Sequence, residues 1–546
     1  MSLPLQELAQ SATAESAESI VRMTFADLGQ PSIPAATVIT SLIPTRALEA
    51  GEQYRFHFDM TKCIGCRSCE IACNEQNGNP ADIHWRRIGE IEGGAYPDTL
   101  RHYLSMGCNH CLDAECVKGC PVDAYTKDPV TGIVLHSADA CIGCQYCVWN
   151  CPYSVPQFNP ERGVIGKCDM CHGRLTDGLE PACVNSCPEA AIEIEIVDMA
   201  AWRKDYAAAE SPGMPAAGHT ISTTRITLPQ NTSAKLERVD TGRIQPEHAH
   251  MSLVFMTTLT QAVIGCLIFT LLCRNAQPLL LALLLAMTAI ALNISTVHLG
   301  RPGYAWRALK MWRRSWLSRE VLCFGIFFVM LSAYTAASWL MALSPALATQ
   351  ELRLYPYSTD ILPLLGWTAA LFGIAGTFAS AFIYLVPARP AWNMVHTPID
   401  FILSGALVGS TLPLSLGWIA QHLSQLSVLH SLNSSAGLSP WPAWPTLLIA
   451  MLWAVNHIVR IVRLNTSSRI EQRATVELLK TQNLRPAVMG SFGFAAASGL
   501  LAFCGAFGYA ALAAFAAVFL IRYLFFVSVV PLNMALTFTR GGSHPC

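Results

Sequence analysis

Charged residues are scarce in this sequence. Asp, Glu, Lys and Arg make up only 13% of its 546 residues, while 52% are hydrophobic. Soluble domains contain about 25% charged residues, so the composition argues against a single soluble domain and against a disordered chain. Acidic residues are nearly missing from the second part, where 6 of the 37 acids and 17 of the 36 bases follow residue 250. The first part is therefore acidic, which gives nucleic-acid binding little support.

A secretory signal is also missing from the start of the sequence. Residues 1–24 contain three glutamates, no basic segment before an apolar core, and no twin-arginine pair. We therefore expect residues 1–53 to form an N-terminal surface extension.

Cysteine is strongly concentrated. Sixteen of the 21 cysteines lie between Cys63 and Cys187, in four groups of four. The groups are Cys63, Cys66, Cys69 and Cys73; Cys108, Cys111, Cys116 and Cys120; Cys141, Cys144, Cys147 and Cys151; and Cys168, Cys171, Cys183 and Cys187. The first and third have the C-x2-C-x2-C-x3-C spacing of bacterial ferredoxins.

Two other uses of cysteine fit these groups poorly. Disulfides suit small secreted domains, and zinc ribbons use paired C-x2-C units rather than runs of three plus one. In the ferredoxin run, three close thiolates bind one cluster and the fourth binds its neighbour. Sixteen ligands at four per cluster predict four [4Fe–4S] clusters.

The segment from Phe58 to about Val197 resembles the four-cluster electron-transfer subunit of the dimethyl sulfoxide reductase family of molybdopterin enzymes. The matching stretches are KCIGCRSCEIAC, GCNHCLDAECVKGCPVDA, ACIGCQYCVWNCPYSVPQFN, and KCDMCHGRL with PACVNSCPEAAI. The resemblance implies an α+β iron–sulfur domain over residues 54–198, made of two bacterial-ferredoxin-like units.

The resemblance also implies which groups share a cluster, pairing the first with the fourth and the second with the third. The implied ligand sets are Cys63, Cys66, Cys69 with Cys187; Cys168, Cys171, Cys183 with Cys73; Cys108, Cys111, Cys116 with Cys151; and Cys141, Cys144, Cys147 with Cys120. Some relatives lack a cysteine of the third group and hold a three-iron cluster. Because Cys147 is present, we expect four-iron clusters throughout.

Long apolar runs follow a linker at residues 199–249. A helix needs about 20 apolar residues to cross the hydrocarbon core of a bilayer. The candidate spans are 252–273, 277–297, 320–343, 361–386, 398–420, 444–463, 487–508 and 510–535. They predict an all-α, eight-helix transmembrane bundle over residues 250–546.

Basic residues mark one side of the predicted bundle. With eight spans, the cysteine-rich domain shares its side with the loops after spans two, four and six, which contain most of the bases. The opposite side has only Arg274 and Arg353. The positive-inside rule then places the iron–sulfur domain on the cytoplasmic side of a bacterial inner membrane. The same arginines could also bind the acidic domain that covers them, and both readings can hold together.

The apolar half resembles the integral membrane anchor of the same enzyme family. The match is sharpest in HLGRPGYAWRALKMWRRSWLSREVL, and HAHMSLVFMTTLTQ and LIRYLFF add to it. The resemblance implies a fused electron-transfer and anchor subunit. It would pass electrons between the quinone pool, menaquinone or ubiquinone, and a separate molybdopterin catalytic subunit.

Two substrates for that partner follow from the resemblance. The partner would either oxidise sulfite or reduce dimethyl sulfoxide or another S- or N-oxide. The WRRSWLSRE loop is more similar to the anchors of sulfite dehydrogenases, and together with the cytoplasmic orientation it favours sulfite. The alternative is a coupling component of a larger respiratory complex with haem or proton pumping.

Two ionisable residues match positions that the anchor family uses at its quinol site. His298 ends the second predicted span, and Glu320 begins the third. Ionisable groups in a membrane are functional candidates, and histidine can accept a proton near neutral pH. In the alternative reading, His298 hydrogen-bonds a loop carbonyl and Glu320 pairs with Arg319 or Arg301.

Three further residues are candidates for the same site. Arg301 and Trp306 would line the quinol slot, while Arg522, deep in the last span, would join helices or belong to a polar path. Haem is not expected, because only His298 and His457 lie near span interiors and haem ligation would need facing histidine pairs.

Overall fold

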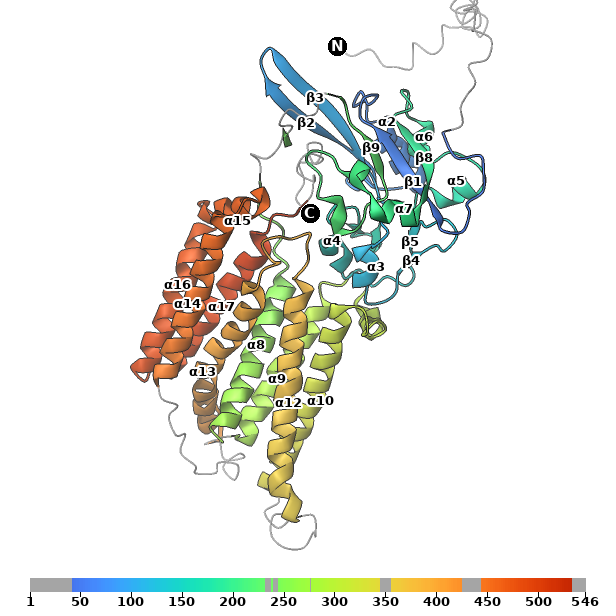
Figure 1. Cartoon of the computed structure of the whole chain (residues 1–546). Coiled ribbons are helices and arrows are strands. Elements are labelled where there is room, and N and C mark those ends of the chain that lie inside the picture. Colours follow the sequence, from blue (N-terminus) through green and yellow to red (C-terminus); the bar gives the residue numbers. More distant parts are fainter. Residues whose placement is uncertain are drawn as a thin grey trace, which may run out of the picture.

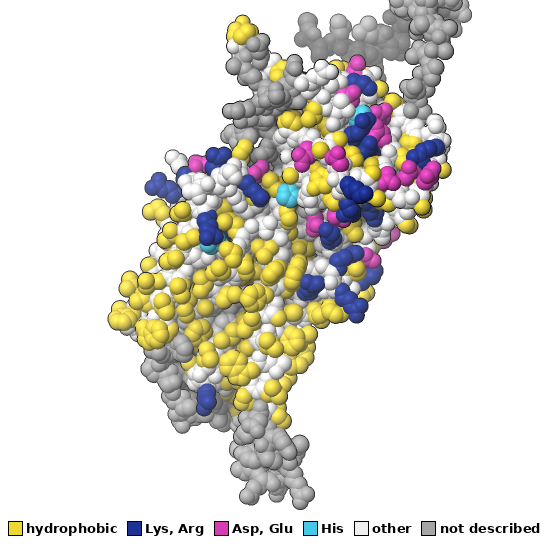
Figure 2. All heavy atoms as spheres, viewed as in Figure 1, with side chains coloured by type: hydrophobic (Ala, Val, Ile, Leu, Met, Phe, Trp, Pro, Cys, Tyr) yellow, Lys and Arg dark blue, Asp and Glu magenta, His cyan; other side chains and the backbone are white. Residues whose placement is uncertain are grey.

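The computed structural model describes residues 42–230, 237–238, 244–274, 276–343, 355–424 and 443–532. Most of the predicted extension, residues 1–41, lies outside the described residues. A domain of short strands and helices rests on one end of a long helical bundle (Figure 1). Hydrophobic side chains cover the visible face of the bundle, whereas charged side chains gather over the first domain and the junction (Figure 2).

A three-stranded sheet forms the outer part of the first domain. Its order is β8-β1-β9, with β8 (Ile192–Asp198) antiparallel and β9 (Arg225–Thr227) parallel to the central β1 (Glu52–Asp59). Strand β8 has the sequence IEIEIVD, which alternates isoleucine with glutamate. This alternation buries Ile192 and Ile194 on one face, as expected for a strand with one covered side.

The other strands form three hairpins. The long hairpin of β2 (Arg87–Ala95) and β3 (Asp98–Met106) projects from the domain and pairs with β10 (Glu237–Arg238). The two short hairpins join β4 (Tyr125–Lys127) to β5 (Val134–His136) and β6 (Gln157–Asn159) to β7 (Val164–Gly166). The cysteine groups lie in loops and on the short helices α2 (Ser68–Asn77), α3 (Glu115–Gly119), α4 (Tyr146–Asn150), α5 (His172–Thr176) and α6 (Ala182–Asn185).

The first part of the predicted linker belongs to this domain. It contains α7 (Met199–Lys204), the 3₁₀ turns η1 (Ala207–Ala209) and η2 (Ala217–His219), and strand β9. Strand β9 has three residues, too few to show a period in the sequence, and it forms because the exposed edge of β1 supplies hydrogen-bond partners. The arrangement of this domain as two ferredoxin-like units stays a prediction.

All eight predicted spans coincide with helices. They are α8 (Met251–Leu272), α9 (Pro278–Thr296), α10 (Trp316–Leu343), α12 (Tyr355–Ile383), α13 (His396–Ser424), α14 (Ala443–Asn465), α16 (Arg485–Phe503) and α17 (Phe507–Val527). Seven helices of the described chain are long and apolar enough to cross a membrane, and α13 is not among them. The count of eight spans therefore stays a prediction.

Two details of the bundle differ from the sequence expectation. Helix α17 ends at Val527 rather than near residue 535, and the chain then turns so that the Leu532 amide donates to the Ala388 carbonyl. Pro531 could not continue the helix, because proline lacks an amide hydrogen and restricts the residue before it. The loop after α14 also contains an unexpected helix, α15 (Ile470–Lys480), whose Ala474, Val476 and Leu478 are buried against the bundle.

Helix α8 lies at the centre of the bundle and contacts α9, α12, α13 and α17. Its contact with α13 depends on small residues: a Cβ atom added at Gly265 would lie 1.9 Å from the Gly405 carbonyl oxygen. Close approach of backbones at glycine is the usual way in which helices associate in membranes, where hydrophobic drive between helices is absent.

Candidate functional site

The sixteen clustered cysteines converge into compact sets. No disulfide links them in the part of the chain that the structure describes. One cavity is lined by Cys63, Cys66, Cys69 and Cys187. A second is lined by Cys108, Cys111, Cys116 and Cys151. Each cavity joins three cysteines of one group to one cysteine of another, which is the donor set that a [4Fe–4S] cluster requires.

The other eight cysteines approach one another in the same way. Electrostatic interaction links Cys73 with Cys171 and Cys183, and Cys168 with Cys73. It also links Cys120 with Cys141, Cys144 and Cys147. The residues present thus fit four cubes, each of which would carry single electrons when bound.

The loops around these cysteines turn their polar groups toward sulfur. Gly65 and Gly143 have φ values of 71° and 69°, so the Cys-x-x-Cys turns they belong to use a left-handed conformation that glycine tolerates. The Gly143 amide donates to Cys141 Sγ at 3.4 Å, and the Thr220 hydroxyl donates to Cys111 Sγ at 3.1 Å. Such hydrogen bonds tune the potential of a cluster. Thr220 was missed in the sequence because it lies in the predicted linker.

The segment between α9 and α10 holds the bundle against the cysteine loops. The Gly300 amide donates to the Gly143 carbonyl at 3.3 Å, and the Arg301 amide donates to the Ile142 carbonyl at 3.1 Å. The Arg301 guanidinium donates to the Ala138 carbonyl at 2.9 Å. Arg301 therefore lies in the contact between the two domains, and it is not among the residues that line the cavity described next.

Other bases of the same segment are also used for docking. Arg314 lies 3.1 Å from the Asp123 carboxylate, and Lys310 lies 3.7 Å from it. The Arg307 guanidinium donates to the Asp139 carbonyl at 2.9 Å. The positive charge of this loop thus has a structural use besides any effect on membrane orientation.

A cavity of about 290 Å³ lies where the two domains meet. His298, Glu320 and Trp306 line it together with Cys144, a member of the third cysteine group. The rest of its wall is mainly apolar: Ile142, Trp149, Leu253, Met256, Leu292, Ser295, Thr296, Leu299, Ala305, Ala308, Leu317, Val321, Phe324, Gly325, Ile383 and Tyr384. Apolar walls with a few convergent polar groups are typical of small-molecule sites.

The two ionisable groups of this cavity lie beside neutral polar partners: His298 interacts with the Ser295 backbone, as in the alternative reading, and Glu320 interacts with the Ser380 side chain. Burial lowers the pKa of His298 to about 4, so its imidazole is neutral at physiological pH. Its Nδ1 atom is buried without a hydrogen-bond partner among the described residues. Glu320 is 5% exposed, and the structure shows no ion pair for it in the described chain. Arg319 instead donates to the carbonyls of Trp312 and Arg313.

Aromatic side chains pack beside two rings of the cavity wall, Trp149 and Tyr384. The Trp149 ring, from the third cysteine group, lies 5.3 Å from the ring of His250 and 5.5 Å from that of Trp392. Tyr384, on the cavity wall, lies 5.3 Å from Trp392. Trp306, also on the cavity wall, is 69% exposed. No spacing in the sequence connects these residues.

Arg522 lies in a separate buried cluster. Its side chain is fully buried, with Nη1 3.2 Å from the Asp400 carboxylate and Nη2 3.0 Å from Gln261 Oε1. His457 Nε2 lies 3.0 Å from the same carboxylate. Arg522 does not line the cavity. Asp400 was not singled out in the sequence, although an acid inside a predicted span is a signal that could have found it.

Two family models match the chain. The 4Fe–4S dicluster domain matches residues 100–196, and the DMSO reductase anchor subunit (DmsC) matches residues 246–532, which is more than half of the chain. This chain belongs to the DMSO reductase anchor subunit family. The resemblance found in the sequence is thereby confirmed for both halves.

Relatives of the first half are iron–sulfur subunits. The B subunit of the anaerobic dimethyl sulfoxide reductase of Haemophilus influenzae is 38% identical over 156 residues, which are 27% of this chain and 76% of that protein. The corresponding B subunit of Escherichia coli K12 is 40% identical over 154 residues, 27% of this chain and 75% of that protein. The formate dehydrogenase-O iron–sulfur subunit of the same strain is 38% identical over 153 residues, 24% and 50% of the two chains.

These matches establish the class of this DMSO reductase family member. It is an iron–sulfur electron-transfer subunit joined to a multi-pass membrane anchor, as part of a DMSO reductase-type oxidoreductase complex. Its cysteines hold [4Fe–4S] clusters. The two family matches show that the cysteine-rich domain and the helical bundle correspond to two kinds of subunit joined in one chain.

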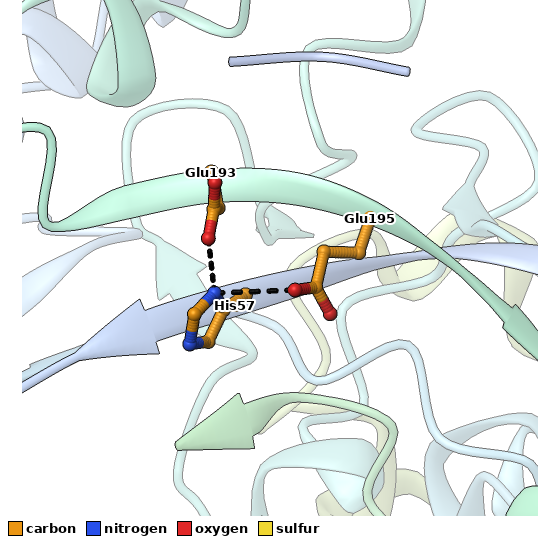
Figure 3. A group of neighbouring side chains, drawn as sticks. All are labelled: His57, Glu193 and Glu195. Atoms are coloured by element: carbon orange, nitrogen blue, oxygen red, sulfur yellow. Dashed lines mark hydrogen bonds and ion pairs between the residues drawn. The ribbon is translucent and has the colours of Figure 1, made fainter. Parts of the chain in front are cut away.

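One further polar cluster lies on the outer sheet of this family member. His57 on β1 faces Glu193 and Glu195 on β8 (Figure 3). Although this set of donors suits a metal ion, Arg55 lies 2.8 Å from Glu195 and Arg225 also pairs with it. The cluster is therefore an ion-pair network that joins β1, β8 and β9.

Proposed function

We propose that this chain exchanges electrons with a membrane quinone, menaquinone or ubiquinone, in the cavity that His298 and Glu320 line. Four [4Fe–4S] clusters would connect that cavity to the separate molybdopterin subunit. The observation that carries the proposal is the shared wall: Cys144, an implied ligand of the cluster with Cys141, Cys147 and Cys120, lines the same cavity as His298 and Glu320.

The proposed cluster ligands are the sets implied by the sequence. They are Cys63, Cys66, Cys69 and Cys187; Cys168, Cys171, Cys183 and Cys73; Cys108, Cys111, Cys116 and Cys151; and Cys141, Cys144, Cys147 and Cys120. The two cavities that each contain four of these cysteines support the first and third sets. The other two sets are supported by the proximity of Cys73 to Cys171 and Cys183 and of Cys120 to Cys141.

The chemistry of the cavity suits a quinol. Oxidation of a quinol releases two electrons and two protons, so its site needs a base on the ring oxygens. The His298 imidazole and the Glu320 carboxyl group are the two ionisable groups that line the cavity, and they are the proposed acceptors of the two protons. Both residues lie at the end of the bundle nearest to the cysteine domain, so protons and electrons would leave the quinol close to Cys144.

Substitution of the two acceptors tests this proposal. His298→Gln and Glu320→Gln keep hydrogen-bonding side chains but remove the proton acceptor. We expect quinone-linked turnover to fall roughly 100-fold, within the range of general base catalysis. Turnover with an artificial dye that reaches the clusters directly should stay near normal. Both activities are measured on the same membrane preparation.

A matched control separates chemistry from assembly. His219→Gln makes the same change in η2, at a histidine that does not line the cavity, and should leave both activities intact. Wild-type quinone turnover in His298→Gln would reject the proposed role of His298. Equal loss of dye and quinone activity would indicate misassembly, and Glu320→Gln would then carry the test.

We further propose that the complex lies in the bacterial inner membrane with the iron–sulfur domain in the cytoplasm. The basic loops on the domain side support this orientation. Two of the relatives named above are, by their names, subunits of dimethyl sulfoxide reductases, and the third is a subunit of a formate dehydrogenase. The WRRSWLSRE loop favours sulfite as the second candidate substrate. Sulfite-dependent quinone reduction and dimethyl-sulfoxide-dependent quinol oxidation, measured on the purified complex, distinguish the two.

A further inference from the structure

Arg86 is a buried cation that has no carboxylate partner in the part of the chain that the structure describes. It precedes β2 and is 2% exposed, and its Cζ atom lies 4.5 Å above the Phe56 ring. Its Nη1 atom donates to the Ser105 hydroxyl at 2.9 Å. The Nε and Nη2 atoms are buried and have no hydrogen-bond partner among the described residues. Elsewhere in the described chain, the buried Arg522 has a carboxylate beside it.

The surroundings of Arg86 belong to two cysteine sets. Ser105 lines the cavity of the first set, and its hydroxyl lies 3.8 Å from Cys69 Sγ. The other thiols that interact electrostatically with the guanidinium are Cys73, Cys168 and Cys183, all from the neighbouring set. The guanidinium thus lies between the two sets.

The backbone makes room for this side chain. A Cβ atom added at Gly107 would lie 3.1 Å from Arg86 Nη2, so glycine at that position lets the guanidinium lie close to the chain that leads into the second cysteine group. Arginine stays charged in proteins, and an unpaired buried charge is costly. Thiolate-ligated clusters are anionic, and they would supply the missing negative charge.

We propose that Arg86 is the shared counter-charge of two clusters: the one held by Cys63, Cys66, Cys69 and Cys187 and the one held by Cys168, Cys171, Cys183 and Cys73. Reduction adds a negative charge to a cluster, so a fixed cation beside it stabilises the reduced form and raises its potential. Arg86 is a positioning residue that makes these two clusters easier to reduce. This inference rests on the ligand sets proposed above.

Potentiometric titration of the assembled complex, followed by electron paramagnetic resonance, tests the inference. In Arg86→Gln we expect the potentials of two clusters to fall by about 60 mV or more, a tenfold change in the ratio of reduced to oxidised cluster for one electron. The other two should keep their potentials. Arg86→Lys retains the charge and should stay near wild type.

Arg55→Gln is the matched control. Arg55 is a largely buried arginine on β1 that is already paired with Glu195 at 2.8 Å and stacks on Trp202. Its substitution should leave all four potentials unchanged. If Arg86→Gln fails to assemble clusters while Arg86→Lys assembles them with normal potentials, the requirement for charge still supports the inference.

Other outcomes would overturn it. The first is an Arg86→Gln protein that assembles its clusters with unchanged potentials. The second is an Arg86→Lys protein whose cluster potentials fall as far as those of Arg86→Gln, or which does not assemble its clusters. The third is an equal fall of the potentials in Arg55→Gln. Iron content and the number of signals in the wild type test the ligand sets separately, so a failure of those sets is distinguishable from a failure of the role of Arg86.

Discussion

At the scale of single residues, the proposed ligand sets make Cys147 one of the four ligands of the cluster beside the His298 cavity. It is buried in the set with Cys141, Cys144 and Cys120. A cube that loses one thiolate ligand also loses the iron it held. We predict that Cys147→Ser changes one cluster to a three-iron form and lowers iron from about 16 to about 15 atoms per chain.

Iron analysis and a three-iron paramagnetic signal, recorded on anaerobic preparations, check this prediction. Cys323→Ser is a suitable control, because this cysteine lies on α10 outside the four sets. A three-iron signal already present in the anaerobic wild type, or none in Cys147→Ser with full activity, would argue against Cys147 as a ligand.

Asp400 compensates the charge of Arg522 inside the bundle. Its carboxylate also interacts with His457 and accepts a hydrogen bond from the Ser404 hydroxyl at 2.9 Å. Asp400→Asn would leave the guanidinium buried and unpaired. We expect this change to cost about 3–5 kcal/mol, as for other broken buried pairs, and to lower the thermal unfolding midpoint of the detergent-solubilised complex.

The comparison includes two more variants. Asp400→Asn combined with Arg522→Gln removes both charges and should recover part of the lost stability. Glu477→Gln breaks an exposed ion pair with Lys480 on α15, and it should lower the free energy of unfolding by less than about 1 kcal/mol. An Asp400→Asn protein as stable as wild type would show that the pair is dispensable.

At the scale of elements, the loop between α9 and α10 joins the bundle to the third cysteine group. Gly300 approaches Gly163 so closely that a Cβ atom there would lie 2.1 Å from the Gly163 carbonyl oxygen. Gly300→Ala must push the two loops apart. We predict a 10- to 100-fold loss of quinone-linked turnover, roughly what a displacement of about 1 Å costs at an active site, while dye-linked turnover is retained.

A neighbouring glycine provides the control for this prediction. A Cβ atom at Gly303, in η3 (Pro302–Leu309), meets nothing within 4 Å, so Gly303→Ala should behave as wild type. Similar losses in both variants would mean that flexibility of the segment, rather than close contact with Gly163, is what matters.

At the scale of the whole molecule, the arrangement predicts which side of the membrane each end of the bundle faces. Cys504 is exposed in the turn between α16 and α17, at the end of the bundle away from the cysteine domain. If that domain is cytoplasmic, an impermeant maleimide should label Cys504 in intact spheroplasts. Labelling that occurs only after permeabilisation would reverse the orientation, and Cys504→Ser shows that the label is specific.

Much of this architecture could be predicted from local features of the sequence. Iron–sulfur clusters are predicted from cysteines with two or three residues between them, because this close spacing lets several thiolates reach one cluster. Helix positions follow from the length of apolar runs, and all eight predicted spans overlap helices. Short features were missed: β9 and α15 form because a sheet edge and the bundle surface offer them partners.

The candidate site depended on tertiary structure. His298 and Glu320 stood out as single ionisable residues beside apolar runs, but their neighbour Cys144 lies more than 150 residues away in the chain. The Arg301 side chain instead binds the Ala138 carbonyl between the two domains, and the Arg522 side chain pairs with Asp400. The sequence by itself determined the iron–sulfur chemistry and the positions of the long helices, since closely spaced cysteines lie within one loop and an apolar run lies within one helix. Only packing between distant segments decided what shares a cavity and which buried charges meet.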